Sequence, residues 1–205
     1  MSKIAVIDYG VGNTGSILKK LRRIGQNSIL ASSRNDIENV SKIILPGVGH
    51  FTSSVRNLKR SGLWDELNES VVHKKLPILG ICLGMQLMSK KSEEGNEDGF
   101  GWIEANVVRF KVEDKIRYKI PHIGWNTIEV KKKSPIFEGV DLAKGFYFVH
   151  SFHLECHNQE DVLATTDYSY PFVSVVQKDH IFGVQFHPEK SHDWGEIFLL
   201  NFLKL

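Results

Sequence analysis

The stretch "PILGICLG", residues 77–84, decides the fold. A proline ends the helical pattern before it, the apolar run inside it predicts a buried strand, and helical spacing follows it. Short apolar strands that alternate with helices are typical of a parallel sheet covered on both faces. Three earlier runs, 3–10, 28–32 and 42–47, alternate with helical patterns in the same way. The sequence therefore predicts an α/β fold with an open, mostly parallel sheet flanked by helices.

The second half of the chain has a different rhythm. Runs rich in β-formers, with turn-like spacers, occupy 105–110, 116–120, 125–130, 146–155, 161–167, 172–178 and 181–187. They predict additional strands, either as a second, largely antiparallel layer or as an extension of the first sheet. Helical spacing predicts helices over 13–25, 51–75 and 195–205. Because no repeat or linker interrupts the pattern, we expect one domain over residues 1–205.

Composition excludes several classes of function. The formal net charge is only +2 and the basic residues are scattered, which argues against a nucleic-acid-binding protein. No apolar run approaches the roughly 18 residues of a membrane span. With two cysteines and an N-terminus that already has the pattern of a strand, we expect a cytoplasmic protein with free thiols.

Cys82 follows the decisive strand, with Gly80 and Gly84 two residues away on either side. A nucleophile on a sharp turn from strand to helix needs small neighbours, because the backbone folds tightly there. The helix N-terminus after it also supplies N–H groups and a positive dipole end, which activate a thiol and bind an oxyanion. A buried core cysteine is common too. This segment alone leaves both interpretations open.

The stretch "GVQFHPEKS", residues 183–191, changes the balance. Pro188 restricts the backbone at itself and at His187, so His187 and Glu189 project from a stiff segment. A histidine within reach of a thiol takes its proton, and a carboxylate behind the histidine stabilises the imidazolium. An exposed pair of charges is the alternative, and the cysteine turn makes it the weaker one.

"GICLGMQ" (80–86) followed about a hundred residues later by "GVQFHPEKS" resembles the class I glutamine amidotransferases, whose triad is Cys–His–Glu. The resemblance runs from "VIDYGVGN" (6–13) to the final helix, and it implies that family's fold. "LPGVGHF" (45–51), "PHIGWN" (121–126) and "YFVHSF" (147–152) are similar to the glutaminase subunits of imidazole glycerol phosphate synthases. The resemblance thus implies a heterodimer with a cyclase that uses the ammonia in histidine biosynthesis.

The resemblance also implies roles for individual residues. Cys82 would attack the amide of L-glutamine to form a thioester, His187 would carry the proton, and Glu189 would orient His187. The N–H groups of Leu83 and, after a local rearrangement, Val48 would hold the oxyanion. The positions that match the substrate pocket are Gly49, Gln86, Glu94, His150, Ser151 and Phe152. The positions that match the partner interface are Asn13, His122, Trp125 and Asn126.

Three of these residues have competing interpretations. Glu94 lies in the charged run 90–98 and would otherwise be a solvated charge. Trp125 would otherwise be a packed strand aromatic. Phe152 stands where many relatives have tyrosine, so a hydrogen bond from that side chain is in doubt.

No cofactor or metal is expected. "HLECH" (153–157) would place His153, Glu155 and His157 on one strand face, but no second ligand pair accompanies them. We interpret it as a polar strand face. "DYGVGN" (8–13) lacks the spacing of both the dinucleotide fingerprint and the P-loop.

Other functions compete with this prediction. Relatives of such subunits also supply ammonia to partners that amidinate surface-polysaccharide sugars, and "SHDWG" (191–195) favours that alternative. An inactive regulatory or scaffold protein is a second alternative, although such chains usually lose the nucleophile or the base. A cysteine peptidase of similar architecture is a third, but it has no need of a glutamine pocket.

Overall fold

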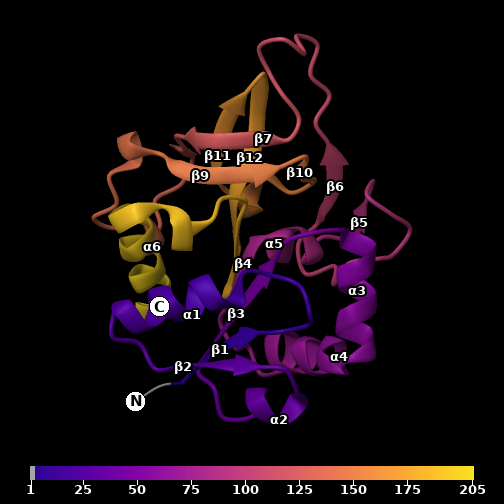
Figure 1. Cartoon of the computed structure of the whole chain (residues 1–205), viewed down its shortest axis with the longest axis vertical. Coiled ribbons are helices and arrows are strands. Elements are labelled where there is room, and N and C mark those ends of the chain that lie inside the picture. Colours follow the sequence, from indigo (N-terminus) through magenta and orange to yellow (C-terminus); the bar gives the residue numbers. More distant parts are fainter. Residues whose placement is uncertain (1–2) are drawn as a thin grey trace.

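The computed structural model describes residues 3–205 (Figure 1). Its main sheet has eleven strands, nine of them in the order β2-β1-β3-β4-β13-β12-β10-β6-β5. The first five of these are mutually parallel: β2 (Ser28–Ala31), β1 (Ile4–Ile7), β3 (Lys42–Gly47), β4 (Ile78–Cys82) and β13 (Ile181–Val184). The predicted parallel sheet is confirmed, and its register places Gly47 beside Cys82 at one edge.

The second half mainly extends this sheet with antiparallel strands. Along the main order these are β12 (Tyr170–Lys178), β10 (Phe152–Cys156) and β6 (Ala105–Arg109), with β5 (Lys91–Ser92) parallel to β6. Beside β12 lies β11 (Val162–Tyr168), and β11 in turn pairs with β8 (Glu129–Val130). A separate antiparallel pair, β7 (His122–Asn126) and β9 (Phe146–His150), packs across β12 through Phe148 and Phe172, whose ring centroids are 5.9 Å apart. Both predicted arrangements therefore occur, and the extension is the larger.

Helices cover both faces of the parallel strands, as Figure 1 shows. On one face α3 (Phe51–Arg60) and α4 (Leu63–Asn68) bury Phe51, Leu58 and Leu67 in one core. On the other, α1 (Thr14–Arg23) and α6 (His192–Lys204) bury Ile17 and Phe198 in a second core. Neighbouring strand residues alternate between the two cores, because successive side chains of a strand point to opposite faces.

Two predicted elements are wrong in detail. The helix expected over 51–75 is broken at Gly62, whose φ of +74° ends α3 and starts α4, and a π-helical turn (Glu69–His73) follows. The strand expected over 116–120 is a turn, because the Asp114 carboxylate accepts the N–H groups of Ile116 and Arg117, both at 3.0 Å. Ile116 is 88% exposed there, so it has no core to face.

The remaining differences are smaller. The run 146–155 divides at Ser151 into β9 and β10, which belong to different sheets. The short helix α2 (Arg34–Ile37) and the strand β5 have patterns too brief to predict. The helices within residues 3–205 are all too short or too polar to cross a membrane.

Candidate active site

Cys82 lies on a sharp turn between β4 and α5 (Leu83–Leu87). Its φ of +54° is in the region that L-residues rarely adopt, and such strain is typical of functional turns. The turn has no room for a side chain at either flanking glycine. A Cβ on Gly80 would lie 2.7 Å from the Met85 nitrogen, and one on Gly84 would collide with the Leu45 carbonyl. The expected tight turn with small neighbours is confirmed.

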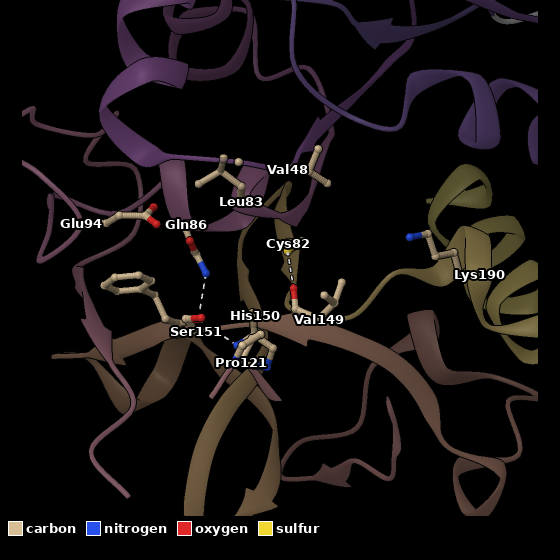
Figure 2. Close-up of a pocket in the computed structure, with 12 residues that line it drawn as sticks. Val48, Cys82, Leu83, Gln86, Glu94, Pro121, Val149, His150, Ser151 and Lys190 are labelled. Atoms are coloured by element: carbon tan, nitrogen blue, oxygen red, sulfur yellow. Dashed lines mark hydrogen bonds between the residues drawn. The ribbon is translucent and has the colours of Figure 1, made fainter. Parts of the chain in front are cut away.

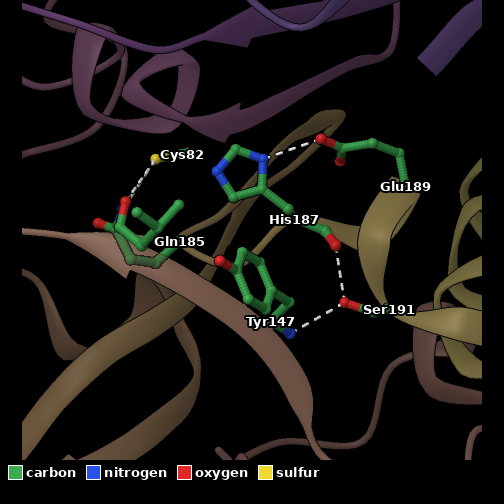
Figure 3. A network of polar contacts seen from close by, with 7 residues as sticks. Cys82, Tyr147, Gln185, His187, Glu189 and Ser191 are labelled. Carbon is green, nitrogen blue, oxygen red and sulfur yellow. Dashed lines mark hydrogen bonds and ion pairs between the residues drawn. The ribbon is translucent and has the colours of Figure 1, made fainter. Parts of the chain in front are cut away.

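His187 and Glu189 form a buried pair beside this turn. The imidazole Nδ1 lies 2.9 Å from the Glu189 Oε1, and the other ring nitrogen faces Cys82 (Figure 3). Within residues 3–205 this second nitrogen, Nε2, has no hydrogen-bond partner. It is therefore free to exchange a proton with the sulfur or with a bound substrate.

The backbone of the His187 segment is held by β9. The His187 N–H donates to the Tyr147 carbonyl at 2.8 Å, and the Ser191 hydroxyl donates to the His187 carbonyl at 2.6 Å. The same hydroxyl accepts the Tyr147 N–H at 3.0 Å (Figure 3). These bonds position the imidazole through its backbone, so the ring keeps its orientation without a contact to its free nitrogen.

The charges around His187 favour its protonated form. Burial alone lowers the pKa of the imidazole, but the facing Cys82 sulfur and the Glu189 carboxylate outweigh it and raise the pKa to about 10. At neutral pH an imidazolium thus lies opposite the sulfur. That arrangement favours a thiolate nucleophile, because opposite charges stabilise each other strongly at a buried site.

A cavity of about 410 Å³ opens in front of the sulfur (Figure 2). All six residues predicted for the substrate pocket line it, together with Cys82, Leu83 and Val48. It is also lined by Pro121, Val149 and Lys190, which the sequence analysis did not single out. His187 and Glu189 do not line the cavity; they lie behind Cys82. The volume suits a small polar metabolite.

One wall of the cavity is neutral and fully hydrogen-bonded. The His150 Nδ1 donates to the Phe152 carbonyl at 2.8 Å, and the His150 Nε2 accepts from the His122 Nδ1 at 3.1 Å. The tautomers follow from the carbonyl, which only accepts. Burial lowers the pKa of His150 far below its ordinary value and that of His122 to about 4. His150 therefore offers neither charge nor a free N–H to a ligand at neutral pH.

The opposite side of the cavity carries a charge. The Glu94 Oε2 accepts the Phe51 N–H at 2.9 Å, at the start of α3. Since this bond engages one oxygen, the other can still pair with a ligand cation. Glu94 is thus an anchored, half-buried carboxylate instead of a solvated charge.

The predicted interface residues divide into two groups. His122 is only 3% exposed and stacks between Phe148 and Tyr168, so its prediction as a surface contact is wrong. The reason is strand alternation: β7 turns His122 inward and exposes Ile123 and Trp125, at 59% and 48%. Trp125 is not a packed core aromatic, although its ring stacks on His192 at 4.6 Å.

The other two interface candidates are partly buried. Asn126 donates to the Asp167 carbonyl at 2.9 Å, and Asn13 precedes α1 without capping it by its side chain. The "HLECH" stretch is not the uniform polar face expected, because His153 is buried against Tyr170, 3.0 Å from its hydroxyl. No three His, Cys, Asp or Glu side chains of residues 3–205 are grouped as metal ligands.

Sequence reasoning also missed Gln185, which is fully buried beside Cys82. Its Nε2 lies 3.6 Å from the Cys82 sulfur, and its Oε1 accepts from the Gln86 Nε2 at 3.1 Å. It belongs to the quoted stretch 183–191, two residues before His187. In an extended segment residues two apart point to the same side, so the position of Gln185 relative to His187 was a signal that its side chain also faces Cys82.

This fold, with a cysteine on its central turn and a His–Glu pair behind it, matches a known class of enzyme. The sequence pattern of "Glutamine amidotransferase class-I" covers residues 5–204, and the chain belongs to that family. Solved structures agree on the fold: a glutamine amidotransferase (20% identical) has a TM-score of 0.74 over 98% of this chain and 97% of its own. The structure of PurLQS from Thermotoga maritima (16% identical) has a TM-score of 0.75 over 99% of this chain and 98% of its own.

Closer relatives share one name. The chain is 47% identical to "Imidazole glycerol phosphate synthase subunit HisH 2" of Methanococcus maripaludis, over 98% of both chains. It is 45% identical to the protein of the same name from Pseudomonas aeruginosa, over 98% of this chain and 99% of the relative. The "subunit HisH 1" of Campylobacter jejuni is 46% identical, over 98% and 100%.

Proposed function

We propose that the chain is the glutaminase subunit of an imidazole glycerol phosphate synthase, which hydrolyses L-glutamine and delivers ammonia to a cyclase subunit. The observation that carries the chemistry is the Cys82 sulfur between an open cavity and the buried His187–Glu189 pair. Near-full-length identity of 45–47% to subunits of that name supports the pathway and the partner.

The reaction starts from the thiolate–imidazolium pair. The Cys82 sulfur attacks the side-chain amide carbon of glutamine, and His187 gives its proton to the departing ammonia, which leaves a γ-glutamyl thioester. The neutral His187 then takes a proton from water as that water attacks the thioester. Glutamate leaves, and the proton returns to the Cys82–His187 pair. Glu189 keeps Nδ1 protonated, so that Nε2 is the nitrogen that exchanges protons.

Two backbone N–H groups are the proposed oxyanion donors. Leu83 follows Cys82 directly at the start of α5 and lines the cavity, as does Val48 across from it. Val48 is 38% exposed, and the next residue, Gly49, has a φ of +104° and is surrounded by open space, since a Cβ added to it would meet no atom within 4 Å. The loop therefore has room to turn the Val48 N–H toward the substrate. Loss of one such donor typically costs about 10²–10³ in kcat.

The substrate's head group would lie at the charged side of the cavity. The free oxygen of Glu94 is placed to pair with the α-ammonium, and Gln86, whose Nε2 is already engaged, presents an acceptor oxygen. Gly49, His150, Ser151 and Phe152 complete the wall. The Phe152 carbonyl accepts from the Gln86 Nε2 and so orients Gln86, a role that needs no hydroxyl on the Phe152 ring.

The partner would cover the exposed side of β7. Ile123 and Trp125 form an apolar pair on this strand, and Asn13 and Asn126 are the polar candidates around it. An aromatic residue is the usual anchor of such an interface. We also propose that residues 1–205 act as one domain and that the protein works in the cytoplasm, where glutamine and a reducing medium are available.

The test is glutamate release from glutamine, measured for the chain alone, with the cyclase subunit, and with the cyclase and its nucleotide substrate. We expect strong stimulation by the complete mixture, and none with Cys82→Ala. Glutamate release that needs Cys82 but does not respond to this partner would contradict the assignment to histidine biosynthesis, while the proposed glutaminase reaction would still stand. Full activity of the Cys82→Ala protein would contradict both.

A second acceptor for the ammonia is supported by one feature. His192, in the unusual stretch 191–195, has a φ of +48° and stacks on the exposed Trp125 at an angle of 5°. His192 therefore shapes the surface beside Trp125 that a partner would meet, and a sugar-amidinating enzyme is the alternative partner for that surface. The same assay with such an enzyme in place of the cyclase distinguishes the two.

A further inference from the structure

Gln185 holds a fixed amide against the nucleophile. The residue follows β13 and is completely buried, and its Nε2 lies 3.6 Å from the Cys82 sulfur. Within residues 3–205 the sulfur makes one other hydrogen-bond contact, with the Val149 carbonyl at 3.9 Å. A carbonyl oxygen only accepts hydrogen bonds, so this contact stabilises the thiol form, whose S–H donates. The side-chain N–H of Gln185 is a donor, so it stabilises the thiolate form of the sulfur.

The direction of this amide is set by its neighbours. The Phe152 carbonyl accepts one N–H of the Gln86 Nε2 at 2.9 Å, and the Gln185 Oε1 accepts from the same nitrogen at 3.1 Å. If Gln86 were flipped, its oxygen would face the Phe152 carbonyl, and two acceptors would oppose each other. With Gln86 fixed in this way, Gln185 must turn its NH₂ group to the sulfur.

We propose that Gln185 is a hydrogen-bond donor that stabilises the Cys82 thiolate, and that Gln86 is the positioning residue that orients it. The inference rests on the proposed function, since it assigns a role in generating that reaction's nucleophile. It also connects the cavity wall with the sulfur, because Gln86 touches both the substrate space and Gln185.

The expected effect follows from the charge of the acceptor. A hydrogen bond to an ionised group stabilises it more than a bond to the neutral form does, especially where water is excluded. Loss of the donor therefore makes the thiolate rarer at a given pH and moves its titration to higher pH. The corresponding loss for a bond to a charged group is about 10-fold to 100-fold.

The test is the pH dependence of Cys82 alkylation by iodoacetamide in the full chain, followed by mass spectrometry of the Cys82 peptide. Gln185→Leu removes the donor, and Gln185→Glu keeps the shape but turns an oxygen toward the sulfur. Ser174→Ala is the matched control. Ser174 is buried on β12, its carbonyl accepts the Gln185 N–H, and its own hydroxyl has no partner in residues 3–205.

We expect both Gln185 variants to shift alkylation to higher pH, with rates at pH 7 at least about 10-fold lower. Gln185→Glu should shift it further, and Ser174→Ala should leave it unchanged. Wild-type profiles in a folded Gln185→Glu protein would overturn the proposal, even if Gln185→Leu failed to fold. Failure of the proposed function would show differently, as wild-type protein that alkylates normally but releases no glutamate with any ammonia acceptor.

Discussion

The two cysteines of this chain are equally buried and chemically opposite. Cys82 is 6% exposed and Cys156 is 7% exposed, and neither forms a disulfide. Cys82 ends the central strand β4, where a parallel sheet opens onto a cavity. Cys156 ends β10 in the antiparallel extension. Burial therefore does not distinguish a nucleophile from a core residue; the neighbouring groups do.

The neighbours of the two thiols act in opposite directions. Cys82 faces an imidazolium and an amide N–H, both of which favour a negative sulfur. At Cys156, burial and then the Asp161 carboxylate raise the pKa of the thiol to about 12. Each cysteine thus has a carboxylate nearby, but only at Cys82 does a histidine stand between them. A nearby carboxylate therefore favours the thiolate at Cys82, where it acts through the imidazolium, and disfavours the thiolate at Cys156, where it acts directly.

The largest contrast is expected when each cysteine is replaced by alanine. Cys82→Ala should lower partner-stimulated glutamate release by about 10⁴-fold or more, as for other catalytic nucleophiles. Cys156→Ala should retain the wild-type rate, because its side chain lines no part of the cavity. Steady-state assays of both variants check this. A large loss of activity in a folded Cys156→Ala protein would break the comparison.

The carboxylates provide the next contrast. Glu189→Gln keeps an acceptor for the His187 Nδ1–H but removes the charge, and kcat should fall by about 10³ to 10⁴. Because Glu189 helps to raise the pKa of His187 to about 10, the variant should lose its imidazolium at lower pH. The alkaline limb of the pH–rate profile should then move to lower pH. Asp161→Asn, beside Cys156, is the matched control and should leave the profile unchanged.

The turn that carries Cys82 can be tested by adding one methyl group. Gly84→Ala would collide with the Leu45 carbonyl on β3 and should lower the free energy of unfolding by about 3 kcal/mol, with loss of activity. Gly15→Ala in α1 meets no atom within 4 Å and should raise it by up to about 1 kcal/mol. Urea denaturation measures both. Equal stabilities would contradict the close packing of the turn.

The smallest effect concerns stability at alkaline pH. An unfolded thiol loses its proton above about pH 8.5, whereas Cys156 keeps its proton in the folded state up to about pH 12. The unfolded state is thus favoured as pH rises, by about 1.4 kcal/mol at pH 9.5. Cys156→Ala should reduce the decline in stability between pH 8 and 9.5 by about 1.2 kcal/mol, because a small part of the loss has already occurred at pH 8. Parallel declines in the two proteins would show that Cys156 titrates normally.

Much of the fold follows from local patterns. The parallel strands were predictable because their apolar runs are short and bounded by turns, as in "KIILPG" (42–47) and "PILGICLG" (77–84). The helix break at Gly62 was not, because a single glycine within a helical pattern is often tolerated. The turn at 116–120 was missed because its apolar residues alternate like a strand, while the Asp114 carboxylate decides the local structure.

The candidate site shows the same division. The motif resemblance predicted most of the residues that line the cavity: residues 48–49, 82–83, 86, 94 and 150–152. Pro121, Val149 and Lys190 also line it and were not predicted. His122 was misplaced because a motif match gives a position in the chain but not the face of a strand. Gln185 was overlooked because its partners, Cys82 and Gln86, are a hundred residues away.

The sequence by itself determined the parallel sheet, the tight turn at Cys82 and the His–Pro–Glu segment, because each depends on the steric preferences of neighbouring residues. Only the tertiary structure decided which nitrogen of His187 is free, which way Gln185 points and why Cys156 is inert. Those properties depend on distances between strands β4, β9, β10 and β13, whose pairing and packing bring side chains together. Reactivity is set by these long-range neighbours, because electrostatic effects on a thiol act through space and not along the chain.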